Sequence, residues 1–139
     1  MKRDERLQGL SSDHHQALVL ARNTNEELTS GKASAATVAR VRATFEAFAP
    51  HFATEEEELL PALRRAGESA LVERTLSDHA AFRAHLAAAE AGDLSRLQAF
   101  ADLLVAHVRF EENELYPAFE RLALDAVMER IAERAAPPR

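Results

Sequence analysis

A twelve-residue segment that occurs twice carries the residue types best suited to chemistry. Residues 51–62 read HFATEEEELLPA and residues 107–118 read HVRFEENELYPA, so that seven of the twelve positions are identical. The identical positions include the histidine and the glutamates at +4, +5 and +7. A similarity that arose from helix packing alone would repeat apolar residues, whereas this one repeats an imidazole and its carboxylates. The repeat therefore indicates a chemical role.

Helical spacing places each repeated histidine next to a carboxylate. Residues four apart lie about one turn apart on the same face of an α-helix. His51 should therefore lie beside Glu55, and His107 beside Glu111. Each pair can direct one imidazole nitrogen and one carboxylate toward a common point.

The remaining acids of the two segments are predicted to lie outside this site. Glutamate-rich helical faces are usually solvated, and we expect this of Glu56, Glu57 and Glu112. Glu58 and Glu114 return to the histidine face a turn later and should lie at its rim.

Histidines on apolar helical stripes complete the candidate site. The sequence has six histidines, of which four fall on such stripes, one in each long predicted helix: His14, His51, His79 and His107. Two of them are preceded by aspartate, in Asp13-His14 and Asp78-His79. The other two, His15 and His85, fall outside the apolar stripes and are predicted to be surface or helix-pairing residues.

Apolar periodicity predicts four long helices and a short extension at the C-terminal end. Glycines and prolines mark the boundaries, and the predicted ranges are about 12–29, 34–66, 69–91 and, for the fourth helix, from 93 or 95 to 117. Residues 122–135 should form either a bent continuation of the fourth helix or a short fifth helix that begins near 125. Pro50 should kink the second helix without ending it, because the apolar pattern resumes after it. Pro137 and Pro138 should end the last helix.

Capping residues and one apolar stripe define the first two helices further. We expect Ser11 or Ser12 to cap the first helix and Ser34 to cap the second. The inward face of the first helix should consist of Leu10, His14, Ala17, Leu18 and Ala21.

Composition bounds the fold class and the partners. The chain has 139 residues, 47% of them apolar, with only four Gly and five Pro, which favours an all-α protein. Short connections predict an antiparallel up-down-up-down four-helix bundle, a single domain over 1–139 with its core at 11–119 and a C-terminal extension at 120–139. No apolar run is long enough to span a membrane, and the net charge of −6 argues against a nucleic-acid partner. We expect a cytoplasmic protein.

Buried carboxylates require a compensating charge, which a metal ion supplies. The chain has no cysteine, and no Lys falls on the histidine stripes; Arg83 is the nearest cation. Four imidazoles and two carboxylates exceed one tetrahedral zinc site and suit two six-coordinate ions. We predict iron, with manganese or zinc as alternatives, one ion held by His14 and His51 and the other by His79 and His107. The carboxylates of Glu55 and Glu111 would bridge the two ions.

The motifs together resemble the hemerythrin-like (HHE) domain family. The matching pieces are Asp13-His14, His51 to Glu56 leading to Leu60-Pro61, Asp78-His79, and His107 to Glu112 leading to Tyr116-Pro117. The resemblance implies a four-helix bundle around a non-heme di-iron centre, with an oxo or hydroxo bridge, that binds or reacts with dioxygen, nitric oxide or peroxide. A role in oxidative or nitrosative stress would follow.

Two departures from oxygen-carrying hemerythrins bear on function. Those proteins have a second histidine one turn before the third-helix ligand, where this chain has Thr75, and an aspartate at +5 in the last helix, where this chain has Glu111 at +4. Sensing or reaction is therefore favoured over reversible oxygen carriage. The alternatives are a low-turnover enzyme of peroxide breakdown or iron-centre repair, assisted by Tyr116 or Glu58, and a metal-free helical interaction domain.

Overall fold

All regular structure in the described part of the chain is helical. The structure is a computed structural model that describes residues 3–135. In chain order its elements are the 3₁₀ turn η1 (Glu5–Leu7), α1 (Gln8–Thr29), α2 (Ala35–Ala47), α3 (Ala49–Thr54), the π-helical segment η2 (Glu55–Leu59), α4 (Leu60–Arg65), α5 (Ser69–Glu90), α6 (Ser95–Phe110), the π-helical segment η3 (Glu111–Leu115), α7 (Tyr116–Arg121) and α8 (Asp125–Ala135).

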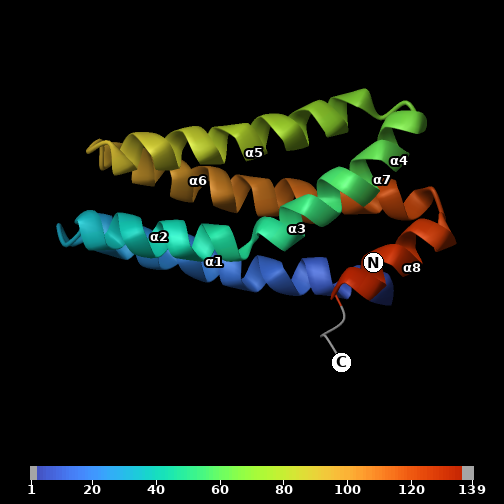
Figure 1. Ribbon diagram of the computed structural model, residues 1–139, viewed down its shortest axis with the longest axis horizontal. Coiled ribbons are helices and arrows are strands. Elements are labelled where there is room, and N and C mark those ends of the chain that lie inside the picture. Colours follow the sequence, from blue (N-terminus) through green and yellow to red (C-terminus); the bar gives the residue numbers. More distant parts are fainter. Residues whose placement is uncertain (1–2, 136–139) are drawn as a thin grey trace.

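These elements assemble into four rods along one long axis (Figure 1). The first rod is α1, the second is α2 to α4, the third is α5, and the fourth is α6 and α7. The chain reverses direction between successive rods, and α6 packs against both α1 and α5 while α2 packs against the same two helices. The predicted all-α bundle is confirmed.

Local sequence signals explain where the rods begin and end. The side chain of Ser34 accepts a hydrogen bond from Ala36 N–H, and the side chain of Thr37 bonds back to the Ser34 N–H, as predicted for a helix cap. Gly31 and Gly67 have positive φ angles of 73° and 85° where the chain leaves the first and second rods.

Two predicted boundaries are wrong. The first helix starts at Gln8, because Asp4 caps the preceding turn η1, so neither Ser11 nor Ser12 is a cap. Pro50 ends α2, which stops at Ala47, and α3 starts two residues later. A proline near the start of a helix costs little, since that N–H has no partner within the helix.

Two apolar clusters fill the bundle on either side of the histidine layer. One contains residues at the α8 end, such as Leu63, Phe119 and Ile131, and the other contains residues toward the opposite end, such as Phe82, Leu97 and Phe100. In each rod the histidine stands between residues of the two clusters. The candidate site is therefore enclosed by apolar packing at both ends.

The inward face of α1 differs from the prediction at one position. Leu10, His14, Ala17 and Ala21 are buried, but Leu18 is 40% exposed. Leu20 and Thr24 are buried in its place, because α1 packs most closely on α6 and presents a slightly rotated face to it.

The C-terminal segment forms a separate short helix that packs against η1, α1 and η2. Ala123 has a φ of 52°, and the helical path is interrupted there between α7 and α8. Val127, Met128 and Ile131 of α8 are buried in the apolar cluster at that end. Pro137 and Pro138 lie outside the described residues. Among the residues that are described, no helix combines the length and apolar content needed to cross a membrane.

Candidate metal centre

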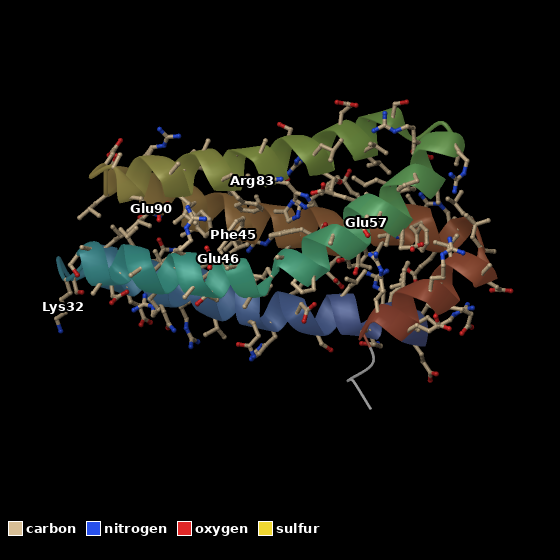
Figure 2. The ribbon with its side chains drawn as sticks, in the orientation of Figure 1. Lys32, Phe45, Glu46, Glu57, Arg83 and Glu90 are labelled. Atoms are coloured by element: carbon tan, nitrogen blue, oxygen red, sulfur yellow. The ribbon has the colours of Figure 1, made fainter. Side chains whose placement is uncertain are left out.

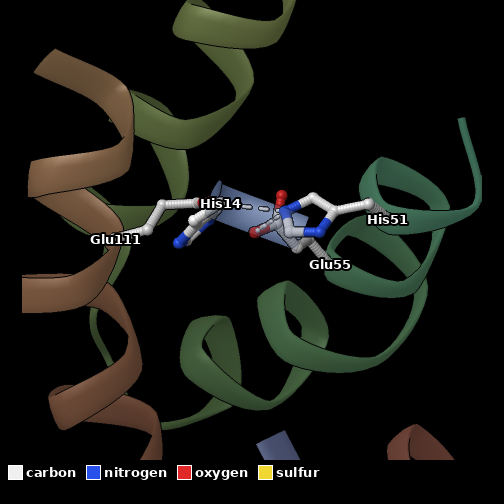
Figure 3. A group of neighbouring side chains, drawn as sticks. All are labelled: His14, His51, Glu55 and Glu111. Atoms are coloured by element: carbon white, nitrogen blue, oxygen red, sulfur yellow. Dashed lines mark hydrogen bonds and ion pairs between the residues drawn. The ribbon is translucent and has the colours of Figure 1, made fainter. Parts of the chain in front are cut away.

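The structure brings together all six residues that the sequence singled out. His14 comes from α1, His51 from α3, Glu55 from η2, His79 from α5, His107 from α6 and Glu111 from η3, and each is at most 6% exposed. Figure 3 shows four of them reaching toward one another: His51 and Glu55 from the second rod, His14 from the first and Glu111 from the fourth. Every rod of the bundle contributes a side chain.

The six residues form two groups of four that share both carboxylates. We call them the His14–His51 group (His14, His51, Glu55 and Glu111) and the His79–His107 group (His79, His107, Glu55 and Glu111). In each group, one potential ligand atom from every residue lies within 4.8 Å of the others. Such spacing can hold one metal ion in each group.

Each shared carboxylate divides its two oxygens between the groups. Glu55 Oε2 lies 3.2 Å from His51 Nε2, and Glu55 Oε1 lies 3.2 Å from His79 Nε2. Glu111 Oε1 lies 2.9 Å from His14 Nε2, and Glu111 Oε2 lies 3.2 Å from His107 Nε2. This is the arrangement that two bridging carboxylates require.

Four buried atoms of the site have no hydrogen-bond partner among the described residues: Glu55 Oε1, His79 Nε2, His107 Nε2 and Glu111 Oε2. Leaving such atoms unpaired in a protein interior is costly. Adjacent ligands at right angles, with bonds of about 2.1 Å, are separated by about 3 Å, which is close to the 3.2 Å found here between nitrogen and oxygen. The donor atoms therefore fit a cation.

A carboxylate from another helix holds the second nitrogen of each imidazole. Nδ1 of His14 donates to Glu112 at 2.8 Å, Nδ1 of His51 to Asp13 at 3.0 Å, Nδ1 of His79 to Glu56 at 2.7 Å and Nδ1 of His107 to Asp78 at 2.8 Å. Because a carboxylate only accepts, Nδ1 carries a proton in each ring, and it is Nε2 that faces the centre. These bonds fix the orientation of all four rings.

The prediction that Glu56 and Glu112 face solvent away from the site is therefore wrong. Their side chains are only 35% and 31% exposed, because they lie between helices at the edge of the bundle and bond to a histidine of the neighbouring rod. Two signals could have identified these partners: the glutamate at +5 is repeated, and so is the Asp-His pair.

Electrostatics within the protein favour charged forms at this centre. Burial would lower the pKa of His107, but the Glu111, Asp78 and Glu55 carboxylates outweigh it and raise that pKa to about 10. The pKa values of His14 and His51 are also raised, against the effect of burial, by their carboxylate neighbours. The pKa of Glu111 is lowered, although burial opposes this, by hydrogen bonds and nearby imidazoles. A metal ion would take over the role of these protons.

The π-helical segments determine which later residues reach the centre. A π turn contains an extra residue, so side chains beyond Glu55 and Glu111 are rotated relative to α-helical spacing. Glu58 bonds to Arg130 of α8 at 2.9 Å and Glu114 is exposed, so the prediction of both at the rim is wrong. Tyr116 is fully buried, and its hydroxyl donates to Glu55 Oε2 at 2.9 Å. It also lies 3.3 Å from His14 Nε2.

The other candidate residues lie outside the centre. His15 is exposed, and His85 accepts a hydrogen bond from Arg96 at 3.0 Å, as expected for a helix-pairing residue. Arg83 is exposed on the side of α5 that faces α2 and α3 (Figure 2), where it lines a surface groove, and it forms no ion pair with Glu55 or Glu111. Thr75 is buried and donates to the Leu71 carbonyl at 2.8 Å.

A small pocket adjoins the His14–His51 group on the side toward the second apolar cluster. Its polar lining consists of His14, His51, His107 and Glu111 alone. The rest of its lining is apolar and comprises Ala17, Phe48, Phe52, Leu104 and Val108. A molecule entering this pocket meets the candidate centre on one side and only carbon on the other.

Comparison with known proteins identifies the family. No curated protein and no solved structure matches the chain. The family model described as hemerythrin HHE cation binding domain matches residues 7–119, which include every residue of the two groups and end before α8. A buried cluster of imidazoles and carboxylates that can hold a metal ion is what such a domain requires. The chain therefore belongs to the hemerythrin HHE cation-binding domain family.

Proposed function

We propose that this protein is a non-heme di-iron protein that binds, senses or reacts with dioxygen, nitric oxide or peroxide. His14 and His51 hold one ion, His79 and His107 hold the other, and Glu55 and Glu111 bridge them. The family binds metal cations, typically iron, and the mixed imidazole and carboxylate donors suit iron or manganese.

The observation that carries this proposal is the sharing of Glu55 and Glu111 between the two groups of donors. A single ion would leave the Nε2 atoms of two of the four buried imidazoles without a metal. Two ions use all six side chains and leave each carboxylate with one oxygen on each ion. Sharing thus supports a pair of ions over a single one.

Open coordination positions follow from the number of donors. Each group offers four ligand atoms, whereas a six-coordinate ion has two more positions to fill. Thr75, where oxygen carriers have a further histidine, leaves one of these without a protein ligand. Iron at such positions supplies redox chemistry and a place for an exogenous small molecule.

The pocket beside the His14–His51 group supports a small, weakly polar ligand. Phe48, Phe52 and Leu104 form its apolar wall, and the wall has no polar donor that would bind an anion or a sugar. A diatomic gas or peroxide fits this description better than a larger polar substrate.

A low-turnover enzymatic role, such as peroxide breakdown, is the second candidate, and Tyr116 favours it. Its hydroxyl is the one neutral proton donor that the described residues direct at the bridging carboxylates. Burial and the neighbouring Glu111 and Glu55 carboxylates raise its pKa well above the ordinary value, so the phenol keeps its proton. It can therefore donate a hydrogen bond, or a proton, toward a molecule bound nearby.

Reconstitution separates these possibilities. Protein purified without added metal is analysed for iron per chain, then loaded anaerobically with Fe(II) and exposed in turn to dioxygen, nitric oxide and peroxide while the absorption spectrum is recorded. Two iron ions per chain and a spectral change with a gas are expected. Multiple turnovers of peroxide would favour the enzyme. If neither the purified nor the reconstituted protein holds iron, the remaining hypothesis is a metal-free helical interaction domain.

A further inference from the structure

The two groups of donors differ in their contact with the side chain of Tyr116. The Tyr116 hydroxyl contacts the His14–His51 group only, through Glu55 Oε2 at 2.9 Å, Glu111 Oε1 at 3.3 Å and His14 Nε2 at 3.3 Å. In the other copy of the repeated segment the matching residue is Leu60, which has no polar group. Tyr116 is the one tyrosine in the chain, so nothing of the same kind can serve the His79–His107 group.

The two groups also differ in how many of their ligand atoms are hydrogen-bonded to other protein atoms. The four buried site atoms without a partner are the four ligand atoms that face the His79–His107 group. In the His14–His51 group, by contrast, Glu55 Oε2 is bonded to Tyr116 and His14 Nε2 lies 2.9 Å from Glu111 Oε1. Three of the four ligand atoms of the His14–His51 group therefore have hydrogen-bond partners, whereas those of the His79–His107 group have only contacts of 3.2 Å with one another.

We propose that the two metal positions fill in a fixed order, the His79–His107 group first and more tightly, and that Tyr116 is the positioning residue that delays the His14–His51 group. This inference rests on the proposed function, since it concerns how that centre takes up its ions.

The order follows from what each ion must displace. An ion entering the His79–His107 group satisfies four buried atoms that have no hydrogen-bond partner, and it displaces only the 3.2 Å contacts of His79 with Glu55 and of His107 with Glu111. An ion entering the His14–His51 group must break the bond from Tyr116 to Glu55 and the contact between His14 and Glu111. The same kind of donor set therefore binds its ion more weakly in the second case.

Tyr116 is held firmly enough to impose this cost. Its side chain is fully buried, its ring is stacked parallel to that of His14 at 5.5 Å between centroids, and Arg3 lies over it at 5.4 Å. The hydroxyl therefore has few other positions available. Removing it leaves Glu55 Oε2 buried and unpaired in the metal-free protein, which is the condition already found in the other group.

Anaerobic titration of the full chain with Co(II), followed by calorimetry and visible absorption, tests the proposal. The wild type should bind two ions in two steps whose affinities differ by at least about tenfold. His79→Ala should abolish the tight step, and His14→Ala the weak one. Tyr116→Phe should lower the melting temperature of the metal-free protein yet tighten the weak step by about tenfold, the factor that corresponds to about 1.4 kcal/mol, and leave the tight step unchanged.

Phe100→Leu serves as a control for general destabilisation, because Phe100 is buried in the apolar cluster remote from Tyr116. It should lower the melting temperature and change neither step. A single step of two equivalent ions in the wild type would overturn the inference and leave the proposed function intact. A weaker second step in Tyr116→Phe would also overturn it, since Tyr116 would then be a ligand. Absence of any Co(II) binding would instead contradict the proposed function.

Discussion

Asp78 of α5 accepts a hydrogen bond from Nδ1 of His107 of α6, at 2.8 Å. The carboxylate is itself held by Arg74, whose Nε lies 3.1 Å away. The bond keeps His107 Nε2 directed at the centre and makes it a stronger donor to a metal ion. The same relationship links the other three histidines to Asp13, Glu56 and Glu112.

Asp78→Asn should weaken metal binding without removing a ligand. The amide keeps the shape of the side chain but loses its charge, and loss of such a partner typically costs about ten- to a hundredfold in affinity. Competition with a chromophoric chelator measures the effect. Glu114→Gln, a charge loss at an exposed position, is the control; an equal loss of affinity in both variants would refute the role assigned to Asp78.

His51→Ala and His107→Ala should lower metal content and melting temperature together in metal-loaded protein. An ion bound only by the folded state stabilises it, by about 2.7 kcal/mol at a hundredfold excess over the dissociation constant. Metal analysis and calorimetry on the same samples measure both quantities. His15→Ala and His85→Ala should leave metal content unchanged. Loss of one iron ion per chain in either variant would show that the residue binds metal and does not lie outside the centre.

Metal-free protein should lose stability as the pH rises from about 6.5 to about 10. The pKa of His107 is raised to about 10, and those of His14 and His51 are also raised. A histidine whose pKa is higher in the folded than in the unfolded protein stabilises the folded state fully at any pH below its pKa in the unfolded protein. This stabilisation is lost as the pH rises through its pKa in the folded protein. The pKa values of Asp78, Glu111 and Glu112 are lowered, so stability should also fall in acid, below about pH 4.

Melting curves with excess chelator across this pH range test the prediction. In metal-loaded protein the alkaline trend should reverse, because each imidazole must lose a proton to bind an ion and metal affinity rises with pH. Identical pH profiles with and without metal would show that these imidazoles do not bind it.

Thr75→His should place a further imidazole one turn before His79. Thr75 is buried at this position and bonds only to the backbone of its own helix, so its loss leaves no other side chain unpaired. A filled coordination position should prolong any oxygenated species, measured by its absorption after dioxygen is mixed with Fe(II) protein. If the oxygenated species lives no longer in Thr75→His than in the wild type, the missing histidine does not explain the departure from oxygen carriage.

Ile131→Ala should destabilise the protein by roughly 2–5 kcal/mol, although α8 lies outside the segment that matches the family. Ile131 is 1% exposed and packs in the same apolar cluster as Leu63 and Phe119. Denaturant unfolding of the chelated protein gives the value. Arg130→Ala, which removes a surface ion pair with Glu58, should cost less than about 1 kcal/mol.

Sequence periodicity predicted the rods and the assembly of His14, His51, Glu55, His79, His107 and Glu111, because an α-helix maps spacing directly onto faces. It failed where the helix is not an α-helix. The π segments after Glu55 and Glu111 place Glu58 against Arg130 of α8 and leave Glu114 exposed, whereas both were expected at the rim of the site. No property of the individual residues marks such a turn.

Contacts between helices were the second feature that the sequence did not predict. Glu56 and Glu112 have the spacing of solvated residues on their own helices, and their partners lie on the neighbouring rods. Leu18 is exposed because α6 covers the face of α1 that carries Leu20 and Thr24. Both outcomes depend on packing between helices rather than on a pattern within one.

Carboxylate partners cross between the two halves of the chain, of which the first comprises α1 to α4 and the second α5 to α7. The exchange is reciprocal. Glu56 of the first half orients His79 of the second, and Glu112 of the second half orients His14 of the first. Neither half alone therefore contains the carboxylate partners of both of its own histidines. In this respect the chain behaves as a covalently linked dimer, and at the centre its two halves differ in the phenol of Tyr116, where the first half has Leu60.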